Sequence, residues 1–392
     1  MSHANVTIED LNKIIPLNLQ AGAASNNPAP WQPLILLGSV GIAKTQYLRT
    51  QLPIFIAQQY ECSPEDVAVI IEKPARRDSA ELAGVALPSK DADGSLNTQF
   101  TKPPTLATIE KAIADGAKHV VLLWDELAAA GASEQKVMAD TLDPAEHSLG
   151  GRPLPTIETH GANVFTCATG NRAQDKAGST RLLSINVNRA MTFNLEFSLP
   201  ALSKYWNDKG LNPLMLDAAE ALHPEGFFVE GVPTEDGAFN TPRQYEQSAG
   251  LLSAFMDSEE FDGTIPRHIE KALSGIIGIK AASQLTKFIG LVDQIPSVSE
   301  ILTTPSECMV PDQTGFQLLA ANKAMASMFG KEDAEAVLKY IVRLRPDLQV
   351  SLGTKLLTIA TKRAWNITDP IGVQFIAKYH DLLPLAVNLE GK

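Results

Sequence analysis

The feature that most limits how this chain can fold is a short apolar run followed by a glycine-containing loop. Residues 34–37 read Leu-Ile-Leu-Leu, and the loop that follows reads Gly38-Ser39-Val40-Gly41-Ile42-Ala43-Lys44-Thr45. A continuous apolar run that stops at glycine is typical of a strand buried on both faces of a parallel sheet. A helix is expected next, from Lys44 to about Tyr60. This order of strand, loop and helix separates a phosphate-binding loop from a chance match.

Each part of the loop has a role in phosphate chemistry. The glycines allow the backbone to turn its N–H groups inward around the β- and γ-phosphates of a nucleotide. The start of the helix adds a partial positive charge. Lys44 neutralises phosphate charge, and the Thr45 hydroxyl is a ligand for Mg²⁺. All eight residues from Gly38 to Thr45 are therefore candidate contacts for ATP.

One residue departs from the usual pattern. Phosphate loops of this type normally have glycine directly before the lysine, where this chain has Ala43. The methyl group is tolerable if Ala43 has already adopted helical φ and ψ. The alternative for the whole segment is an ordinary glycine-containing turn between a strand and a helix.

Two further apolar runs end in polar side chains. Val120–Trp124 is followed by Asp125 and Glu126, and Val164–Ala168 is followed closely by Asn171. Carboxyl ends of parallel strands meet at the edge of the sheet where ligands bind. Asp125 is expected to hold Mg²⁺ through water, and Glu126 to orient and activate the attacking water.

Asn171 is a candidate to position the same water beside the γ-phosphate. Taken singly, the acidic pair is also compatible with a solvated turn, and Gly170-Asn171 with a plain turn. The three motifs in this order predict an ATPase that uses ATP and Mg²⁺.

Composition restricts the remaining classes. The net charge of −12 disfavours nucleic acid as the main partner unless basic residues are concentrated locally, for example in a pore. No apolar run approaches the ~18 residues needed to span a bilayer, and the N-terminus does not resemble a secretory signal. The three cysteines are far apart, as expected of reduced thiols. A cytoplasmic protein is expected.

The pattern of runs predicts an α/β fold with a five-stranded, mostly parallel sheet between helices. The expected strands are Leu34–Leu37, Val67–Ile71, Val120–Trp124, Asn163–Ala168 and Met191–Phe197. After a boundary near Pro200 the chain becomes rich in Ala and Leu. Amphipathic helices are expected there at 243–257, 266–292, 314–329, 331–343 and 353–364.

With its three motifs in order, the chain resembles the AAA+ ATPases, and within them the MoxR-like branch, over roughly residues 30–250. The resemblance makes Gly38–Thr45 the Walker A motif, Val120–Glu126 Walker B and Thr166–Asn171 sensor 1. Residues 78–104 resemble the hairpin inserted in the second helix of that branch, which lies on the pore side of the ring.

Two arginines take their roles from the same resemblance. Arg189 matches the arginine finger that reaches the ATP of a neighbouring subunit, although Ala190 stands where Phe is usual and Arg181 or Arg172 could take the role. Arg243, after Thr241 and Pro242 at the start of a helix, resembles sensor 2.

The implied domains are an N-terminal helix and loop (1–33), an AAA+ core (34–200), a helical lid with sensor 2 (201–290) and a C-terminal helical extension (291–392). The implied function is a ring-forming, hexameric chaperone or motor that remodels a protein, with a von Willebrand A-domain partner suspected. The alternatives are a nucleic-acid translocase resembling McrB, with Arg76, Arg77, Lys90 and Lys102 as the basic candidates, and a nucleotide-dependent scaffold with little turnover.

Overall fold

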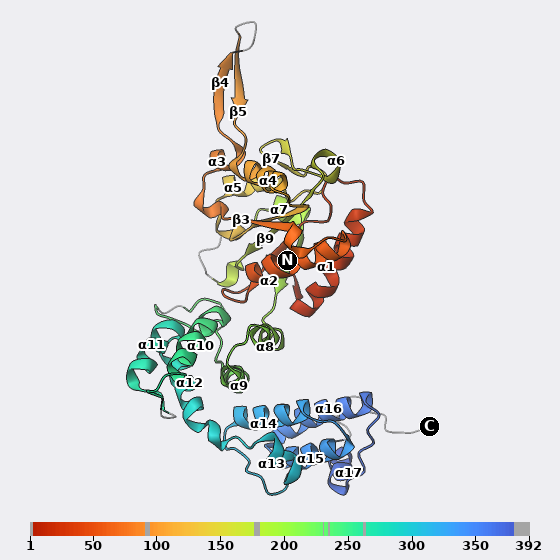
Figure 1. Ribbon diagram of the computed structural model, residues 1–392, viewed down its shortest axis with the longest axis vertical. Coiled ribbons are helices and arrows are strands. Elements are labelled where there is room, and N and C mark those ends of the chain that lie inside the picture. Colours follow the sequence, from red (N-terminus) through yellow and green to blue (C-terminus); the bar gives the residue numbers. More distant parts are fainter. Residues whose placement is uncertain are drawn as a thin grey trace. The chain divides into compact units, whose positions relative to one another are not determined.

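The computed structural model describes residues 3–90, 95–175, 181–229, 231–233, 236–261 and 264–379. The chain divides into two compact units. The sheet unit contains residues 1–202, 229–236 and 241–243, and the helical unit contains residues 203–228, 237–240 and 244–392. Figure 1 shows the elements of both units.

The sheet unit is built on a six-stranded parallel sheet in the order β1-β10-β2-β9-β6-β3. In that order the strands are Ala4–Val6, Met191–Leu195, Leu34–Leu37, Asn163–Gly170, His119–Trp124 and Val67–Glu72. The α/β fold and the five expected strands are confirmed. The sixth strand, β1, was not expected, because three residues paired to β10 at the sheet edge carry no apolar run of their own.

Helices cover both faces of this sheet. Leu34 and Leu36 of β2 pack with α1 (Ile8–Ala23) and α2 (Lys44–Gln59) on one face. Ile35 and Leu37 pack on the other face, in a core shared with α3, α4 and α5. The alternation follows from the period of two along a strand. Both faces of the central strands β2, β6 and β9 are buried, which explains why these strands are mostly apolar.

The remaining elements of the sheet unit are short. They are α3 (Ser79–Ala83), α4 (Pro104–Ala114), α5 (Ala132–Ala139), α6 (Ile157–His160), α7 (Ser184–Arg189), and the paired strands β7 (Ser148–Leu149) and β8 (Arg152–Pro153).

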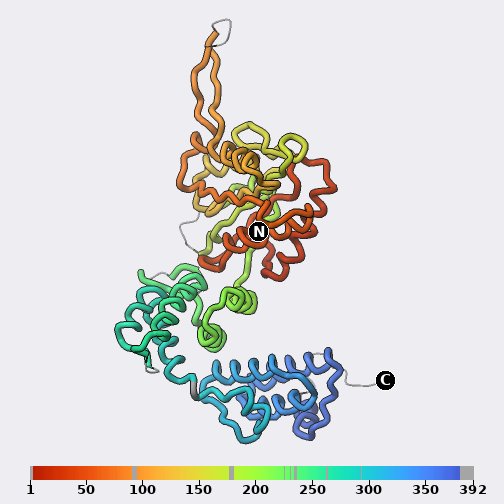
Figure 2. The backbone as a smooth tube through the Cα atoms, in the orientation of Figure 1, coloured from red at the N-terminus to blue at the C-terminus, as the bar shows by residue number. Residues whose placement is uncertain are grey.

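A hairpin interrupts the chain between α3 and α4. Strands β4 (Ala86–Lys90) and β5 (Leu96–Phe100) pair antiparallel, and Figure 2 shows them extending away from the sheet. Leu96 is 80% exposed and Phe100 57%. A two-stranded hairpin has little stability alone, and these apolar side chains suit contact with another surface. Residues 91–94 of the expected insert lie outside the described residues.

The remaining helices belong mainly to the helical unit. They are α8 (Leu199–Asp208) and α10 (Pro242–Met256), both of which begin in the sheet unit, and α9 (Pro213–Leu222), α11 (Arg267–Ile277), α12 (Ile279–Leu291), α13 (Val298–Thr303), α14 (Thr314–Ala326), α15 (Lys331–Ile341), α16 (Pro346–Lys362) and α17 (Pro370–Tyr379).

The expectation of one helix over 266–292 is wrong. The chain breaks at Gly278, whose φ of 83° lies outside the helical region and favours glycine. Amphipathic spacing continues on both sides of the break, so periodicity alone could not reveal it. Helices α8, α9, α13 and α17 were not expected.

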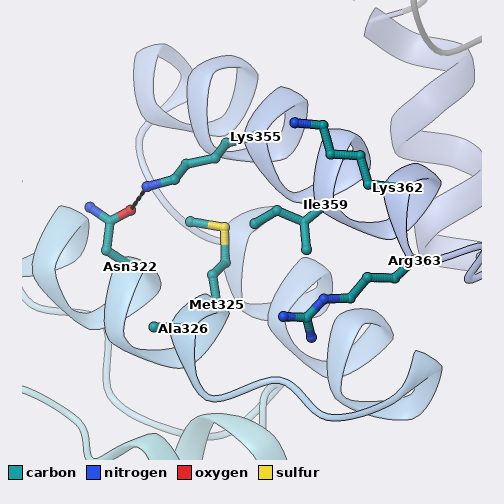
Figure 3. A pocket seen from close by; sticks show the side chains of 7 residues that line it. All are labelled: Asn322, Met325, Ala326, Lys355, Ile359, Lys362 and Arg363. Carbon is teal, nitrogen blue, oxygen red and sulfur yellow. Dashed lines mark hydrogen bonds between the residues drawn. The ribbon is translucent and has the colours of Figure 1, made fainter. Parts of the chain in front are cut away.

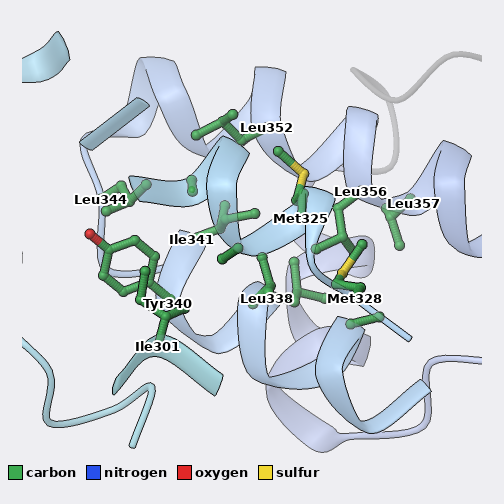
Figure 4. Close-up of a cluster of buried hydrophobic side chains, with 14 of the residues drawn as sticks. Ile301, Met325, Met328, Leu338, Tyr340, Ile341, Leu344, Leu352, Leu356 and Leu357 are labelled. Atoms are coloured by element: carbon green, nitrogen blue, oxygen red, sulfur yellow. The ribbon is translucent and has the colours of Figure 1, made fainter. Parts of the chain in front are cut away.

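The last five helices of this unit enclose a separate hydrophobic core. Tyr340 and Ile341 of α15 and Leu356 of α16 are fully buried in it (Figure 4). Helices α13, α14 and α17 contribute Ile301, Met325 and Phe375 to the same core. Residues 380–392 of the expected C-terminal extension lie outside the described residues. Within the described ranges, no helix is both long and apolar enough to cross a membrane.

Close packing between α9 and α14 generates a stability prediction. A Cβ added at Gly315 would lie 2.0 Å from the carbonyl oxygen of Ala221. Because backbone must move to relieve that overlap, Gly315→Ala should lower the free energy of unfolding by about 1–3 kcal/mol, measured by urea denaturation.

Gly250 in α10 is the matched control, because a Cβ there meets nothing within 4 Å. Gly250→Ala should stabilise by about 0.5–1 kcal/mol through helix propensity. Equal effects of the two substitutions would contradict the described packing.

Candidate active site

A polar pocket of about 140 Å³ lies where the strands of the sheet unit end. It is lined by Val40, Gly41, Ile42, Ala43, Lys44, Thr45, Lys73, Asp125, Glu126, Thr169, Gly170, Asn171 and Arg243. Strands β2, β3, β6 and β9 deliver most of these residues, because their carboxyl ends meet at one edge of the sheet. The structure therefore brings together most of the predicted site. Gly38 is held beside it by a 3.2 Å hydrogen bond from its N–H to the carbonyl of Gly170.

The side-chain amine of Lys44 binds to the backbone of its own phosphate loop. The Nζ donates to the carbonyl oxygens of Gly38 (2.8 Å) and Ser39 (2.6 Å) and to Oδ1 of Asn171 (3.2 Å). The residue is 8% exposed, and burial lowers the pKa of its amine to about 8. A buried ammonium is stabilised by a nearby anion, so a bound phosphate would favour the charged form of Lys44.

Asp125, directly after β6, connects that strand to the phosphate loop. Its Oδ1 accepts hydrogen bonds from the hydroxyls of Thr45 (2.7 Å) and Thr169 (2.6 Å). Burial alone would raise the pKa of this carboxyl, but the two hydroxyls and Lys73 outweigh burial and lower it. Asp125 is therefore ionised at neutral pH and lies directly beside the Thr45 hydroxyl, which suits a hard cation such as Mg²⁺.

Lys73 is a site residue that the sequence did not reveal. It follows β3, and its Nζ lies 3.2 Å from Asp125 Oδ2 and 3.1 Å from Glu126 Oε1. Burial tends to lower the pKa of this amine, but hydrogen bonds to the two carboxylates raise it. Its position directly after an apolar strand is the signal that would have found it. In this conformation Lys73 neutralises the acidic pair and restrains Glu126.

Two residues of the pocket other than glycine have a left-handed backbone. Ala43 has φ 67° and ψ 21°, and Glu126 has φ 60° and ψ 34°. The condition stated for Ala43, helical φ and ψ, is therefore not met, whereas the expected start of the helix at Lys44 is confirmed. The position that usually carries glycine keeps a backbone geometry that favours glycine. This conformation costs roughly 1–2 kcal/mol for an L-residue, and such strain is found most often at functional sites.

The predicted sensor 2 segment contacts the phosphate loop. A Cβ added at Gly41 would lie 2.5 Å from Oγ1 of Thr241, so only glycine fits there. Helix α10 begins at Pro242 as expected, and Arg243 lines the pocket. The charge of Arg243 also lowers the pKa of Lys44, which indicates that the two cations act on the same space.

The other predicted arginines lie elsewhere. Arg189 does not line the pocket; it makes ion pairs with Asp140 (2.8 Å) and Asp143 (2.9 Å). Arg172 donates to the Ser39 hydroxyl (2.5 Å) and pairs with Asp175, so it supports the outside of the loop. Arg181 is exposed and follows residues 176–180, which lie outside the described residues.

Comparisons with known proteins add little to this description. No model of a known protein family matches the sequence, and no curated protein matches it significantly. Among solved structures, the similar chains include the Orc1 protein of Aeropyrum pernix in complex with DNA, with 12% identity, a TM-score of 0.30, and coverage of 98% of this chain and 79% of that chain.

Two others are PCH-2 of C. elegans and NtrX of Brucella abortus. PCH-2 has 12% identity and a TM-score of 0.35 over 71% of this chain and 67% of that chain. NtrX has 11% identity and a TM-score of 0.35 over 95% of this chain and 67% of that chain. Likeness at this level assigns neither a family nor an activity to this chain.

The strained Ala43 gives a direct test of the loop conformation. Ala43→Gly should relieve about 1–2 kcal/mol of left-handed strain and lose about 0.5–1 kcal/mol through unfolded-chain entropy. The net result is a gain of up to about 1.5 kcal/mol in the free energy of unfolding, measured by urea denaturation.

Ala107 is the control, because it is exposed in the regular helix α4. Ala107→Gly should destabilise by about 1 kcal/mol. Destabilisation by both substitutions would show that Ala43 has an ordinary helical backbone.

Proposed function

We propose that this chain is a P-loop ATPase that binds ATP with Mg²⁺ and hydrolyses it to ADP and phosphate. The observation that carries the proposal is the 2.7 Å hydrogen bond from Thr45 to Asp125, in a pocket that also contains Lys44, Asn171 and Arg243. An ordinary turn at the end of a strand does not require this combination of charged and polar side chains. The pocket combines a phosphate loop that includes Lys44, a hydroxyl–carboxylate pair that suits a metal ion, and the further cation Arg243. Together these groups match the requirements of phosphoryl transfer.

The residues have distinct roles in this proposal. Residues 38–45 surround the β- and γ-phosphates, and Lys44 exchanges its carbonyl partners for phosphate oxygens. Thr45 and Asp125 would hold Mg²⁺, which would supply positive charge to the phosphate oxygens. Arg243 adds a cation at the same pocket. Catalysis of phosphoryl transfer depends mainly on such positioning and electrostatics.

Glu126 is the proposed general base, and Asn171 positions the attacking water. The side chain of Glu126 is 45% exposed, so water reaches it, but its carboxylate is paired with Lys73. Activation of water requires that this ion pair loosens, because a carboxylate bound to an ammonium is a weaker proton acceptor. Lys73 is therefore placed to keep the base inactive until the site is occupied.

Glu126→Gln separates binding from hydrolysis. The amide retains the size of the side chain but cannot accept the proton, so turnover should fall by about 10²-fold or more while ATP affinity stays within a few-fold. The measurements are steady-state phosphate release and equilibrium binding of a fluorescent ATP analogue. Unchanged turnover would remove Glu126 from the role of base.

We also propose the AAA+ class and, within it, a MoxR-type ring motor. In this assignment residues 34–200 form the core, residues 201–290 form a lid and residues 291–392 form a further helical part. The supporting features are Arg243 in the pocket and the exposed hairpin β4–β5, placed between α3 and α4. The ring would be a hexamer in the cytoplasm, acting on a protein or through a von Willebrand A-domain partner.

Arg189 is the proposed arginine finger of such a ring. It is held outside its own subunit's pocket by Asp140 and Asp143, which leaves it able to act only on a neighbouring site after exchange of these ion pairs. Fingers of this type contribute on the order of 10³–10⁵ in rate.

Arg189→Ala should therefore keep ATP binding but lose the turnover that increases with protein concentration. Mixing it with Lys44→Ala subunits should restore some activity, because hybrid interfaces combine an intact loop with an intact finger. Asp140→Asn is the control that weakens the ion pair and keeps the arginine; its turnover should remain. Loss of activity without recovery in the mixture would reject Arg189 as the finger.

The charges favour a protein over a nucleic acid as the object of this motor. Two of the basic candidates near the hairpin are already paired: Arg77 with Glu72 and Glu81, and Lys102 with Glu110. A scaffold with little turnover is disfavoured by the presence of both Glu126 and Asn171 beside the phosphate loop.

A further inference from the structure

The helical unit carries a groove that the proposed ATPase does not use. It has a volume of about 320 Å³ and runs between one face of α14 and one face of α16 (Figure 3). Helix α14 contributes Asn322, Met325 and Ala326, and α16 with the residue after it contributes Lys355, Ile359, Lys362 and Arg363.

The groove combines an apolar floor with a cationic border. Met325 and Ile359 form the floor. The border contains Lys355, Lys362 and Arg363, and no carboxylate is among the lining residues. Three cations without a lining anion are unexpected in a chain of net charge −12. The border is therefore complementary to a negatively charged partner.

The cations are held in position to different degrees. Lys355 Nζ donates to Asn322 Oδ1 (2.8 Å), and Arg363 donates to the carbonyl of Met328 (2.9 Å) while lying 4.9 Å from the centre of the Trp365 ring. No acceptor in the described part of the chain binds Lys362, which is exposed. Arg363 and Lys355 are therefore held in place by hydrogen bonds within the chain, whereas Lys362 can form an ion pair with a partner.

The spacing of the side chains along α16 defines which partner helix can bind in the groove. Lys355, Ile359 and Lys362 are separated by four and then three residues, which places them on one helix face. The two lysines are about 10 Å apart along the axis at about 1.5 Å per residue. An opposing helix with two carboxylates seven residues apart and an apolar side chain between them has the same spacing.

We propose that this groove binds an acidic amphipathic helix of a partner protein, with an apolar side chain against Met325 and Ile359 and carboxylates against Lys355 and Lys362. Helix-in-groove recognition uses this division between an apolar anchor and flanking charges. The apolar floor does not suit a phosphate backbone, which cannot be buried against methyl and thioether groups without loss of hydration.

Among the helices that the structure describes, none carries two carboxylates seven residues apart, so none of these helices in a second copy of this chain has the matching spacing. The proposed occupant is a different protein.

The test uses the full chain and a designed, fluorescein-labelled helical peptide with Glu, Leu and Glu at positions i, i+4 and i+7. Fluorescence anisotropy should give saturable binding with a Kd of about 10–100 µM, weakened by salt. A methyl NMR spectrum of the methionines should show a shift of Met325 on titration and no shift of Met215, which is fully buried in α9.

Matched charge reversals locate the site. Lys355→Glu/Lys362→Glu should weaken binding at least about tenfold, whereas Lys271→Glu/Lys280→Glu, at exposed positions of α11 and α12, should change it less than about twofold. A peptide with Lys in place of both Glu residues should not bind.

Three results would overturn the proposal. They are the absence of binding up to about 1 mM peptide, equal weakening by the two charge-reversed variants, and displacement of the peptide by a short DNA duplex, which would show that the groove recognises phosphates.

Discussion

The hydrogen bond between Thr45 and Asp125 is the contact on which the proposed site depends. It connects the start of α2 to the end of β6, two elements that are eighty residues apart in the chain, at 2.7 Å. A hydrogen bond to an ionised carboxylate contributes about 1.5–3 kcal/mol and fixes orientation. With Thr169 bound to the same oxygen, the carboxylate has one preferred position. The loop and the acidic strand therefore form one rigid site rather than two neighbouring turns.

Around that contact, three features of the pocket are energetically unfavourable or pair its charged groups with each other. Lys44 is buried with a pKa lowered to about 8, Glu126 has a left-handed backbone, and Lys73 neutralises the acidic pair. Each feature is unfavourable or inactive in the isolated chain. A bound polyphosphate would supply negative charge beside Lys44, and Thr45 and Asp125 would hold its metal ion, which would supply positive charge beside the Asp125 carboxylate.

The sequence predicted what depends on continuous apolar runs and short motifs. Strands β2, β6 and β9 are buried at every position, so their sequences are mostly apolar, and the polar residues after them meet at one sheet edge. Arg243, which was expected at the site only from resemblance, lines the pocket. These features account for most of the sheet and the core of the candidate site.

The features that sequence could not provide depend on backbone geometry or on pairing. Strand β1 is specified by its partner β10 rather than by its own residues. The left-handed Ala43 and the break at Gly278 are conformations that a hydrophobic pattern does not encode. Lys73 becomes a site residue only because β3 lies beside β6, where it reaches both carboxylates.

Equilibrium binding of ATP with Mg²⁺ to the wild-type chain and to Lys44→Ala tests the central claim most directly. The account predicts that the wild-type chain binds and that Lys44→Ala loses at least about a hundredfold in affinity, or about 2.7 kcal/mol. Lys136→Ala, at an exposed position of α5, should bind as the wild type does. Retained affinity in a folded Lys44→Ala chain would contradict the assignment of this pocket to ATP.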